Sequence, residues 1–539
     1  MGYWAFDYST ASLHGALLVL LLCLILIAHR ALVGRPRLPP GPKGLPLIGN
    51  VLDLPSKATW VALRDFSRRY GDVMSLNIFG ETIIVLNSMT AATELLEKRS
   101  IYAGRPSSLV SLSETLGWNW SFGFKGYTDE WRRERRLLWQ YFHPSTVQQW
   151  HSVQLRESRR FLQCLLRDQS KINDQIRLSL CRTLLGAAYG IPAEEVTMRH
   201  VDVLTDGEDG VSEAYDPAAF YIPWLMRNLP NWLLSEKLQA KLARWRSQSK
   251  AMVEVPFEDS QNAMKRGVAQ SSILSDLLGI APLPTEITRD VVHEERAKVV
   301  AAAAFFAGTD TTVGMFYAFF CAMTLYPEIQ KHAQGELDAV VGSDRLPEHA
   351  DRPSLPYINA LVKELIRWYN ILPLGLYRSA LEDDQYKGWD IPRGTTVIAN
   401  IWAILHNEQQ YPEPDTFQPG RFLKNGELDQ DVLDPGSVVF GFGRRFCPGK
   451  HFADDTLFIN IASVLHVFDI MPALDGQGKP IPVIPKIAPG FISYVLGPWT
   501  GNFYSWCYAR TLEPFEYSIR LRSNTAESLL RSGSEDGCE

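Results

Sequence analysis

The sequence lacks an excess of positive charge, because 54 lysine and arginine residues stand against 60 aspartate and glutamate residues, a formal net charge of −6 at pH 7. Nucleic-acid-binding domains carry a clustered basic surplus, so we expect no nucleic-acid partner. The sequence also lacks internal repeats and low-complexity linkers. With 46% hydrophobic and 21% charged residues among 539, the chain has enough apolar side chains to bury a large core.

Cysteine is scarce and scattered. The seven cysteines form no CxxC pair and no spacing typical of a zinc knuckle. Their odd number and wide separation argue against a disulfide framework and indicate a reducing compartment. A cysteine with a chemical role should therefore act singly.

One long apolar run stands apart from the rest of the chain. Residues 11–28 read ASLHGALLVLLLCLILIA, and about 18 such residues form roughly 27 Å of helix, close to the thickness of a bilayer core. Arg30, Arg35 and Arg37 follow the run, and basic flanks favour the cytosol. We therefore expect a membrane anchor at residues 1–30 and a proline- and glycine-rich hinge at residues 31–55. A cleaved signal peptide is the alternative, although no basic segment precedes the run.

The rest of the chain is predicted to be mainly α with a minor β part. Strand-like runs occur at Val73–Ile78 and Thr82–Leu86, and short strands return near Thr395–Ala399. The longest helical stretch, Ile287–Leu325, contains no proline and is closed by Pro327. A helix of that length must cross the whole core of a globular domain.

The most informative segment is FGFGRRFCPGKHFADD, which surrounds Cys447. Its glycines let the backbone approach a flat or bulky group closely, and Pro448 suits the first position of a helix. A thiolate just before a helix start receives amide hydrogens and the positive end of the helix dipole, which we expect to lower its pKa. Three roles are open: a buried structural cysteine, a nucleophile with His451 as its base, and a metal ligand. Arg444 and Arg445 favour the third, because they could bind the carboxylate arms of a haem.

The same segment resembles the haem-binding signature FxxGxRxCxG of the cytochrome P450 superfamily. Further hallmarks follow in the right order from about residue 38 to residue 495, and the chain is most similar to membrane-bound fungal members, especially those of secondary metabolism. The resemblance implies the cytochrome P450 fold with its long central helix and haem b held by an axial thiolate. The signature residues are Phe440, Gly443, Arg445, Cys447 as the iron ligand, and Gly449.

A second motif, AGTDTT at residues 307–312, lies in the long helix. Thr311 stands four residues after Ala307, so its hydroxyl can reach back to that carbonyl and bend the helix. Taken alone, the motif could be a harmless polar patch. The resemblance implies instead that Asp310 and Thr311 are the catalytic acid–alcohol pair, which relays protons during oxygen activation.

Two further motifs match positions that hold the haem and its loop. Glu364 and Arg367, in ALVKELIRWY, are three residues apart and share one helical face. The resemblance implies that they form a buried structural triad with Arg421. Trp131 and Arg135, in YTDEWRRERRLL, are four residues apart and also share a face. The resemblance implies that both bind a haem propionate.

The chain departs from the family pattern at two places. Arg378 stands where many fungal relatives have a histidine that touches a propionate, a role that an arginine fork can also fill. The segment LGPWTGNFYSWCYARTL, residues 496–512, separates GFIS from the strand-like EPFEYSIRLRS. It is either an aromatic loop or a translated intron in a faulty gene model. We therefore expect a catalytic domain at residues 56–523, with 496–512 as an atypical insertion, and a polar tail at residues 524–539.

The resemblance implies a monooxygenase that uses O2 and electrons from NADPH, delivered by NADPH–cytochrome P450 reductase. Its substrate would be an apolar small molecule, such as a terpenoid or another secondary-metabolite intermediate. It would be a single-pass protein of the endoplasmic reticulum membrane with a cytosolic catalytic domain. Arg132 and Arg136 either belong to a basic patch for the reductase or are simply solvated. Candidate substrate contacts, each of which could equally be core packing, are Gly117–Phe124, Ala303, Ala304, Phe305, Leu372–Tyr377 and Phe491–Tyr494.

Two other functions remain open. One is a haem-thiolate isomerase or dehydratase of the same fold, although such enzymes usually lose the acid–alcohol pair that Asp310 and Thr311 would form. The other is an inactive membrane-bound scaffold, which the insertion after Val495 favours.

Overall fold

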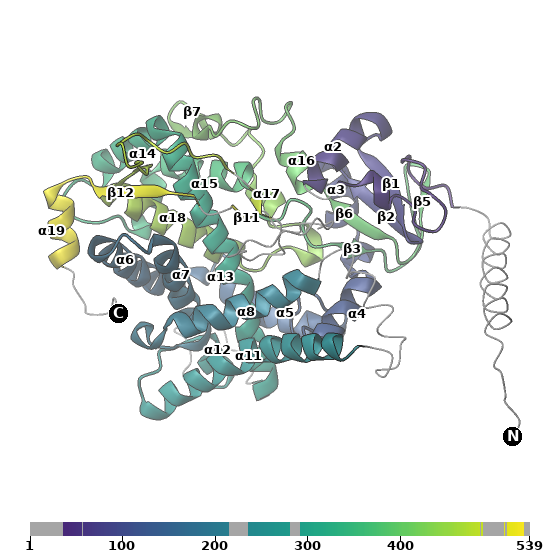
Figure 1. The fold of residues 1–539 in the computed structure, drawn as a ribbon, viewed down its shortest axis with the longest axis horizontal. Helices are drawn as coiled ribbons and strands as arrows, with labels where there is room; N and C mark the ends of the chain where they lie inside the picture. Colours follow the sequence, from purple (N-terminus) through teal and green to yellow (C-terminus); the bar gives the residue numbers. More distant parts are fainter. Residues whose placement is uncertain are drawn as a thin grey trace, which may run out of the picture.

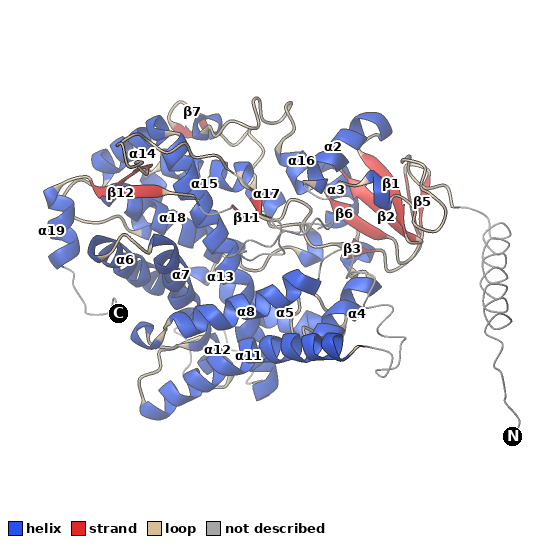
Figure 2. Cartoon of the chain, in the orientation of Figure 1, coloured by secondary structure: helices blue, strands red, loops and turns tan. Residues whose placement is uncertain are grey.

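The computed structural model describes residues 36–55, 58–214, 235–280, 292–485, 487–488, 511–512 and 515–532. Helices make up most of this part of the chain, and the largest sheet lies at one end of it (Figures 1 and 2). The prediction of a mainly α fold with a minor β part is therefore confirmed. The expected anchor at residues 1–30 and residues 496–510 of the insertion lie outside the described residues.

Most helices form one body beside the sheet (Figure 1). The α-helices of the described residues are α2 (Thr59–Tyr70), α3 (Met89–Ala92), α4 (Ser107–Leu116), α5 (Asp129–Phe142), α6 (His151–Arg167), α7 (Ile172–Tyr189), α8 (Met198–Ala214), α11 (Glu236–Arg266), α12 (Ile273–Leu277), α13 (Glu294–Leu325), α14 (Pro327–Val340), α15 (Pro356–Trp368), α16 (Ile401–Leu405), α17 (Gly436–Val439), α18 (Lys450–Val467) and α19 (Asn524–Ser532).

The strands form one four-stranded sheet and several two-stranded ladders. They are β1 (Val73–Ile78), β2 (Glu81–Leu86), β3 (Arg378–Ser379), β4 (Asp384–Tyr386), β5 (Trp389–Ile391), β6 (Thr396–Ala399), β7 (Leu423–Lys424), β8 (Glu427–Leu428), β9 (Phe468–Pro472), β10 (Ile487–Ala488), β11 (Thr511–Leu512) and β12 (Tyr517–Leu521).

Helix α13 runs through the middle of the helical body (Figure 1). It has 32 residues, which is about 48 Å at 1.5 Å per residue. The His293 side chain caps its first turn, and the helix ends at Tyr326, where Pro327 begins α14. It packs against α5, α7, α11, α15 and α18. Among the described residues it is the one helix long and apolar enough to cross a membrane, but most of it is buried inside the protein, as a core helix is. The predicted long central helix is confirmed.

The four-stranded sheet has the order β1–β2–β6–β3. Strands β1 and β2 form an antiparallel hairpin, and β6 pairs in parallel with β2. The turn of the hairpin holds Phe79 and Gly80 at positive φ. The described part of the predicted hinge, residues 36–55, lies along β1: Ser75 donates from its hydroxyl to Pro39 at 2.6 Å and from its amide to Pro40 at 2.9 Å. The path of the chain into the catalytic domain is thus fixed by hydrogen bonds to the sheet.

The carboxy-terminal elements lie at the opposite end from the sheet (Figure 1). Strand β12 pairs antiparallel with β9. Residues 524–532 of the expected polar tail form α19, which packs on α6 and buries Ala526 and Leu530. Cys164 of α6 is disulfide-bonded. The cysteine spacing, which argued against disulfides, did not predict this bond.

Candidate active site

Cys447 lies in a tight loop between α17 and α18. Its amide donates to the carbonyl of Phe440 at 2.7 Å, which closes the loop. Gly443 has a φ of +52°, and its amide donates to a carboxylate oxygen of Glu97. A Cβ at this position would lie 2.3 Å from the carbonyl oxygen of Leu96. Both the backbone conformation and the space available therefore require glycine here.

The sulfur of Cys447 receives the helix-start contacts that the sequence predicts. The amides of Gly449 and Lys450 donate to it and Arg135 lies close enough to favour the thiolate, but burial is the larger effect and raises the pKa of Cys447. The expected lowering of the pKa is therefore wrong for the chain alone. A bound metal ion stabilises a thiolate far more than amides do, so this environment suits a metal ligand. Within the described part of the chain, no hydrogen bond joins His451 to Cys447. The role of Cys447 as a nucleophile with His451 as its base therefore has no support from the structure.

Four arginines gather in a buried region beside this loop: Arg105, Arg135, Arg378 and Arg445. Burial, followed by repulsion from the other three guanidinium groups, lowers the pKa of Arg445 to about 7. Burial and repulsion from Arg105 and Arg135 also hold the pKa of Arg378 well below its usual range. Over the described ranges, no carboxylate forms an ion pair with Arg135, Arg378 or Arg445. Buried cations need anions nearby, and the two carboxylate arms of a haem fit this requirement.

The arginines are held in place by backbone carbonyls. Arg445 donates to Ala103 at 2.9 Å and its guanidinium lies 3.9 Å from the centre of the Trp131 ring. Arg378 donates to Phe442 at 2.9 Å, which ties β3 to the cysteine loop. These contacts orient the guanidinium groups without neutralising them, because carbonyl groups are uncharged.

Two polar residues in this region, Trp131 and Arg105, make contacts that the sequence does not predict. Trp131 donates its indole N–H to the carbonyl of Phe122 at 3.0 Å, so its role as a propionate donor stays a prediction. Arg105 was missed. It donates to Gly123 at 2.8 Å and to Tyr377 at 2.6 Å, and nothing around it in the sequence except a Gly-Arg-Pro step marked it.

The predicted triad assembles in the structure. Both Glu364 and Arg367 are completely buried. Arg367 donates to the Glu364 carboxylate through Nε at 2.6 Å and Nη2 at 2.8 Å, and Arg421 donates through Nε at 3.2 Å. The amide of Gln418 donates to the same carboxylate at 2.7 Å. The triad therefore ties α15 to the loop that precedes the cysteine.

On α13, Asp310 and Thr311 face different sides. The hydroxyl of Thr311 donates to the carbonyl of Ala307 at 2.8 Å, the hydrogen bond that the spacing predicts. Ala307 is exposed and Thr311 half-buried, so one face of this otherwise buried helix is accessible. Asp310 is buried, and its charge adds to the effect of burial in raising the pKa of Cys181 on α7. The helix thus carries an acid on its buried side and an alcohol on its accessible side.

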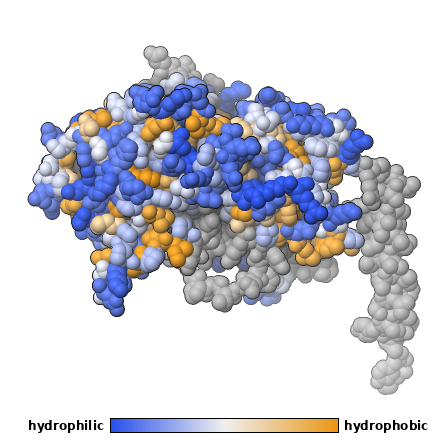
Figure 3. All heavy atoms as spheres, turned by 90° about the horizontal axis from the view of Figure 1, so that it is seen from above, coloured by the Kyte–Doolittle hydropathy of each residue, from blue (hydrophilic) through white to orange (hydrophobic). Residues whose placement is uncertain are grey.

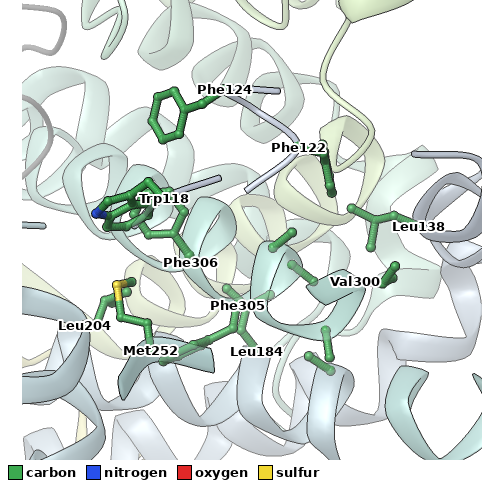
Figure 4. Close-up of a cluster of buried hydrophobic side chains, with 14 of the residues drawn as sticks. Trp118, Phe122, Phe124, Leu138, Leu184, Leu204, Met252, Val300, Phe305 and Phe306 are labelled. Carbon is green, nitrogen blue, oxygen red and sulfur yellow. The ribbon is translucent and has the colours of Figure 1, made fainter. Parts of the chain in front are cut away.

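An aromatic cluster lies where α4 ends and against α13 (Figure 4). The rings of Trp118 and Phe306 are 4.6 Å apart, and Trp120 stacks on Trp118 at 5.2 Å. The indole N–H of Trp120 donates to Ser249 of α11 at 2.9 Å, which links three segments distant in sequence.

The other candidate substrate contacts differ in burial: within Leu372–Tyr377, for example, Leu374 and Tyr377 are buried, whereas Leu372 and Leu376 are half-buried. Ala303, Ala304 and Phe305 are buried, and Phe305 packs beside Tyr189 in the core. The candidates at Phe491–Tyr494 lie outside the described residues.

Comparison with known proteins finds similarity to one family along most of the chain. A family model described as cytochrome P450 matches residues 39–488. Cytochrome P450 monooxygenase COX2 of Coprinopsis cinerea is 38% identical over 466 residues, 85% of this chain and 88% of that protein. Cytochrome P450 monooxygenase ple1 of Rhodocybe pseudopiperita is 36% identical over 500 residues, 92% and 91% of the two chains. Tryptamine 4-monooxygenase of Psilocybe cyanescens is 36% identical over 493 residues, 89% and 96% of the two chains.

Proposed function

Because the chain belongs to the cytochrome P450 family and is a haem-thiolate monooxygenase, we propose that Cys447 provides the thiolate that binds the haem iron. The observation that carries this assignment is the set of guanidinium groups of Arg135, Arg378 and Arg445 beside the cysteine loop, with which no described carboxylate forms an ion pair. A structural cysteine would need neither the arginines nor a glycine at position 443.

Haem, when bound, supplies the reductive activation of O2 by which one oxygen atom enters the substrate. The residues of this chain bind and orient it. We assign the carboxylate arms to Arg135, Arg378 and Arg445, with Trp131 as a further donor. Guanidinium groups suit this role because each can donate two parallel hydrogen bonds to one carboxylate.

Proton delivery is assigned to Thr311 and Asp310. The Thr311 hydroxyl lies on the accessible face of α13 and must release the carbonyl of Ala307 before it can donate a proton outward. We assign the resupply of that proton to Asp310, the preceding residue of the helix, in its protonated form. This pair favours the monooxygenase over an isomerase or dehydratase of the same fold, which would need no proton delivery to oxygen.

The substrate is proposed to be an apolar small molecule, a terpenoid or another secondary-metabolite intermediate. The stacked rings of Trp118, Trp120 and Phe306 offer apolar area and few hydrogen-bonding groups, which suits such a molecule. One relative is named for tryptamine, which is aromatic. An aromatic molecule is therefore a second candidate among apolar small-molecule substrates.

The electron donor is proposed to be a membrane-bound NADPH–cytochrome P450 reductase that docks on α5. Arg133 and Arg136 are exposed there, and Arg132 is exposed but paired with Asp129. Arg135 of the same helix reaches the carbonyl of Phe446, next to Cys447. An acidic partner on this surface would therefore lie a short distance from the cysteine loop.

Attachment to the endoplasmic reticulum membrane, by a single span with the catalytic domain in the cytosol, rests on the apolar run at residues 11–28. Four of the large apolar side chains exposed on the described residues support it: Leu45, Leu47 and Leu52, which precede β1, and Phe79, in the β1–β2 turn. The amide of Phe79 donates to Ile48 at 3.4 Å, so these segments are neighbours. On the face drawn in Figure 3, apolar residues gather in several small patches between polar ones.

The test of the iron ligand is the carbon monoxide difference spectrum of the reduced protein. Cys447→Ala should lose the thiolate-type Soret band. Cys447→His should keep haem but give an imidazole-type band, which separates loss of the ligand from loss of the fold. Cys321→Ala, at a buried free cysteine of α13, should keep the thiolate-type band. A thiolate-type Soret band in Cys447→Ala or in Cys447→His would overturn the assignment.

A further inference from the structure

Three potential metal ligands from three separate elements meet at the start of α6. They are His151, the first residue of α6, His349, the first residue of a 3-10 helix at His349–Ser354, and Asp455 of α18. One ligand atom from each lies within 4.8 Å of the others. The imidazole rings stack at 3.8 Å with their planes 11° apart, and Nε2 of His151 lies 3.2 Å from Oδ2 of Asp455. The haem-binding signature at residues 440–449 ends before Asp455, and the other motifs described above include neither histidine.

The His349 ring is the least expected member of this group. Both of its nitrogen atoms are enclosed by protein, and neither forms a hydrogen bond with a described residue. Enclosed polar atoms are nearly always hydrogen-bonded, so an imidazole with two unpartnered nitrogens calls for an explanation. Burial, the main cause, lowers the pKa of His349 to about 4. A neutral imidazole offers the lone pair of one ring nitrogen, which is what a metal ligand must provide.

Asp455 has the hydrogen bonding of an oriented metal ligand. Its Oδ1 accepts from Nη1 of Arg352 at 2.8 Å, while its Oδ2 faces His151. The other arm of Arg352 donates to Asp454 at 2.6 Å, so two carboxylates offset this one cation. Arg159 is the other cation near His349. Outer hydrogen bonds of this kind fix the free oxygen of a carboxylate toward a metal ion.

We propose that His151, His349 and Asp455 bind one divalent ion of the Zn²⁺ type, with water completing the coordination. Imidazole and carboxylate are ligands that Zn²⁺ accepts in tetrahedral geometry. Zinc–nitrogen distances of about 2.0–2.1 Å place ligand atoms roughly 3.4 Å apart, so the rings must turn toward each other. His349 can turn because no hydrogen bond to a described residue holds its ring. A bound ion would link α6, the turn at His349 and α18, the helix that begins just after Cys447.

The test uses the full-length, haem-loaded protein, purified without a histidine tag, treated with a chelator and titrated calorimetrically with ZnSO4. The wild type should bind one Zn²⁺ per chain. Asp455→Asn should bind at least tenfold more weakly, and His349→Phe should lack the site. Phenylalanine keeps the stack on His151 and removes two unpartnered nitrogens, so the fold is retained. The matched control is His332→Phe, because His332 stacks on Tyr357 at 3.9 Å and 11° but belongs to no such cluster.

A second measurement separates this site from other zinc-binding surfaces. Saturating Zn²⁺ should raise the thermal unfolding temperature of the wild type and of His332→Phe, and leave that of His349→Phe unchanged. The carbon monoxide spectrum confirms that every variant carries haem. Absence of a one-to-one site in the wild type overturns the proposal. Equal affinity in the wild type and His349→Phe also overturns it, because the ion would then bind elsewhere.

Discussion

Replacing Glu364 with alanine removes the shared acceptor of the buried triad. Its carboxylate accepts from two nitrogens of Arg367, from Arg421 and from the amide of Gln418. Without it, two guanidinium groups remain side by side in a region that water does not reach. Breaking a buried ion pair from one side costs about 3–5 kcal/mol, and an unpartnered buried amide costs about 1–3 kcal/mol. The two costs overlap, so we expect a loss of about 4 kcal/mol or more, a large share of the stability of an ordinary domain.

The neighbouring pair offers a matched control. Lys363 and Asp434 approach to 2.5 Å, but their side chains are 30% and 43% exposed. Solvent screens such pairs, and Lys363→Met should cost at most about 1 kcal/mol. Glu364→Gln keeps the shape and one acceptor oxygen and should fall between the two, at about 2–3 kcal/mol.

The measurement compares the fraction of protein that carries haem and the urea midpoint of tryptophan fluorescence. Midpoints are compared directly, because a large chain with a cofactor does not unfold in two states. Glu364→Ala should carry at least severalfold less haem and unfold at a lower midpoint than Lys363→Met. If Glu364→Ala matched Lys363→Met in both measurements, the triad would not support the cysteine loop and the reasoning would be refuted.

Three further predictions follow from the site. Thr311→Ala should retain haem but form less product per NADPH consumed, measured as the ratio of the two; an unchanged ratio would remove the hydroxyl from proton delivery. Gly443→Ala, which places a methyl group 2.3 Å from the Leu96 carbonyl at a φ of +52°, should lower the haem-loaded yield severalfold, whereas Gly420→Ala, with nothing within 4 Å, should not. The haem-free protein should lose stability as pH rises above about 9. The reason is that burial raises the pKa of Cys447 in the folded chain above its value in the unfolded chain, so the unfolded chain ionises first. The urea midpoint of Cys447→Ala should therefore vary less with pH than that of the wild type.

The sequence predicted those parts of the fold that depend on local signals. The hairpin was predicted from the strand-like apolar runs at Val73–Ile78 and Thr82–Leu86, which are separated at Gly80, a residue that takes positive φ. The long helix lacks proline until Pro327 ends it. The triad could be predicted because Glu364 and Arg367 share a helical face.

Features that depend on distant contacts could not be predicted. Arg105 joins the cluster from a loop separated from Tyr377 by 272 positions, and no local pattern marks it. His151 and Asp455 are 304 positions apart, so their meeting with His349 has no sequence signature. The pKa of Cys447 was predicted in the wrong direction because the helix-start amides are local and readable, whereas the burial that outweighs them is set by the packing of the whole domain.

The two supports of the cysteine loop differ in kind, and this difference explains how haem and fold depend on each other. The triad and the bond from Gly443 to Glu97 are complete within the chain, so the loop has its shape before haem binds. The arginine cluster is incomplete, because burial and mutual repulsion lower the pKa of Arg378 and Arg445. A dianionic ligand removes that repulsion only in the folded state, and a ligand that binds the folded state alone stabilises it. Under the proposed assignment, haem is therefore held by a loop that is already formed, and the fold reaches its full stability only with haem bound.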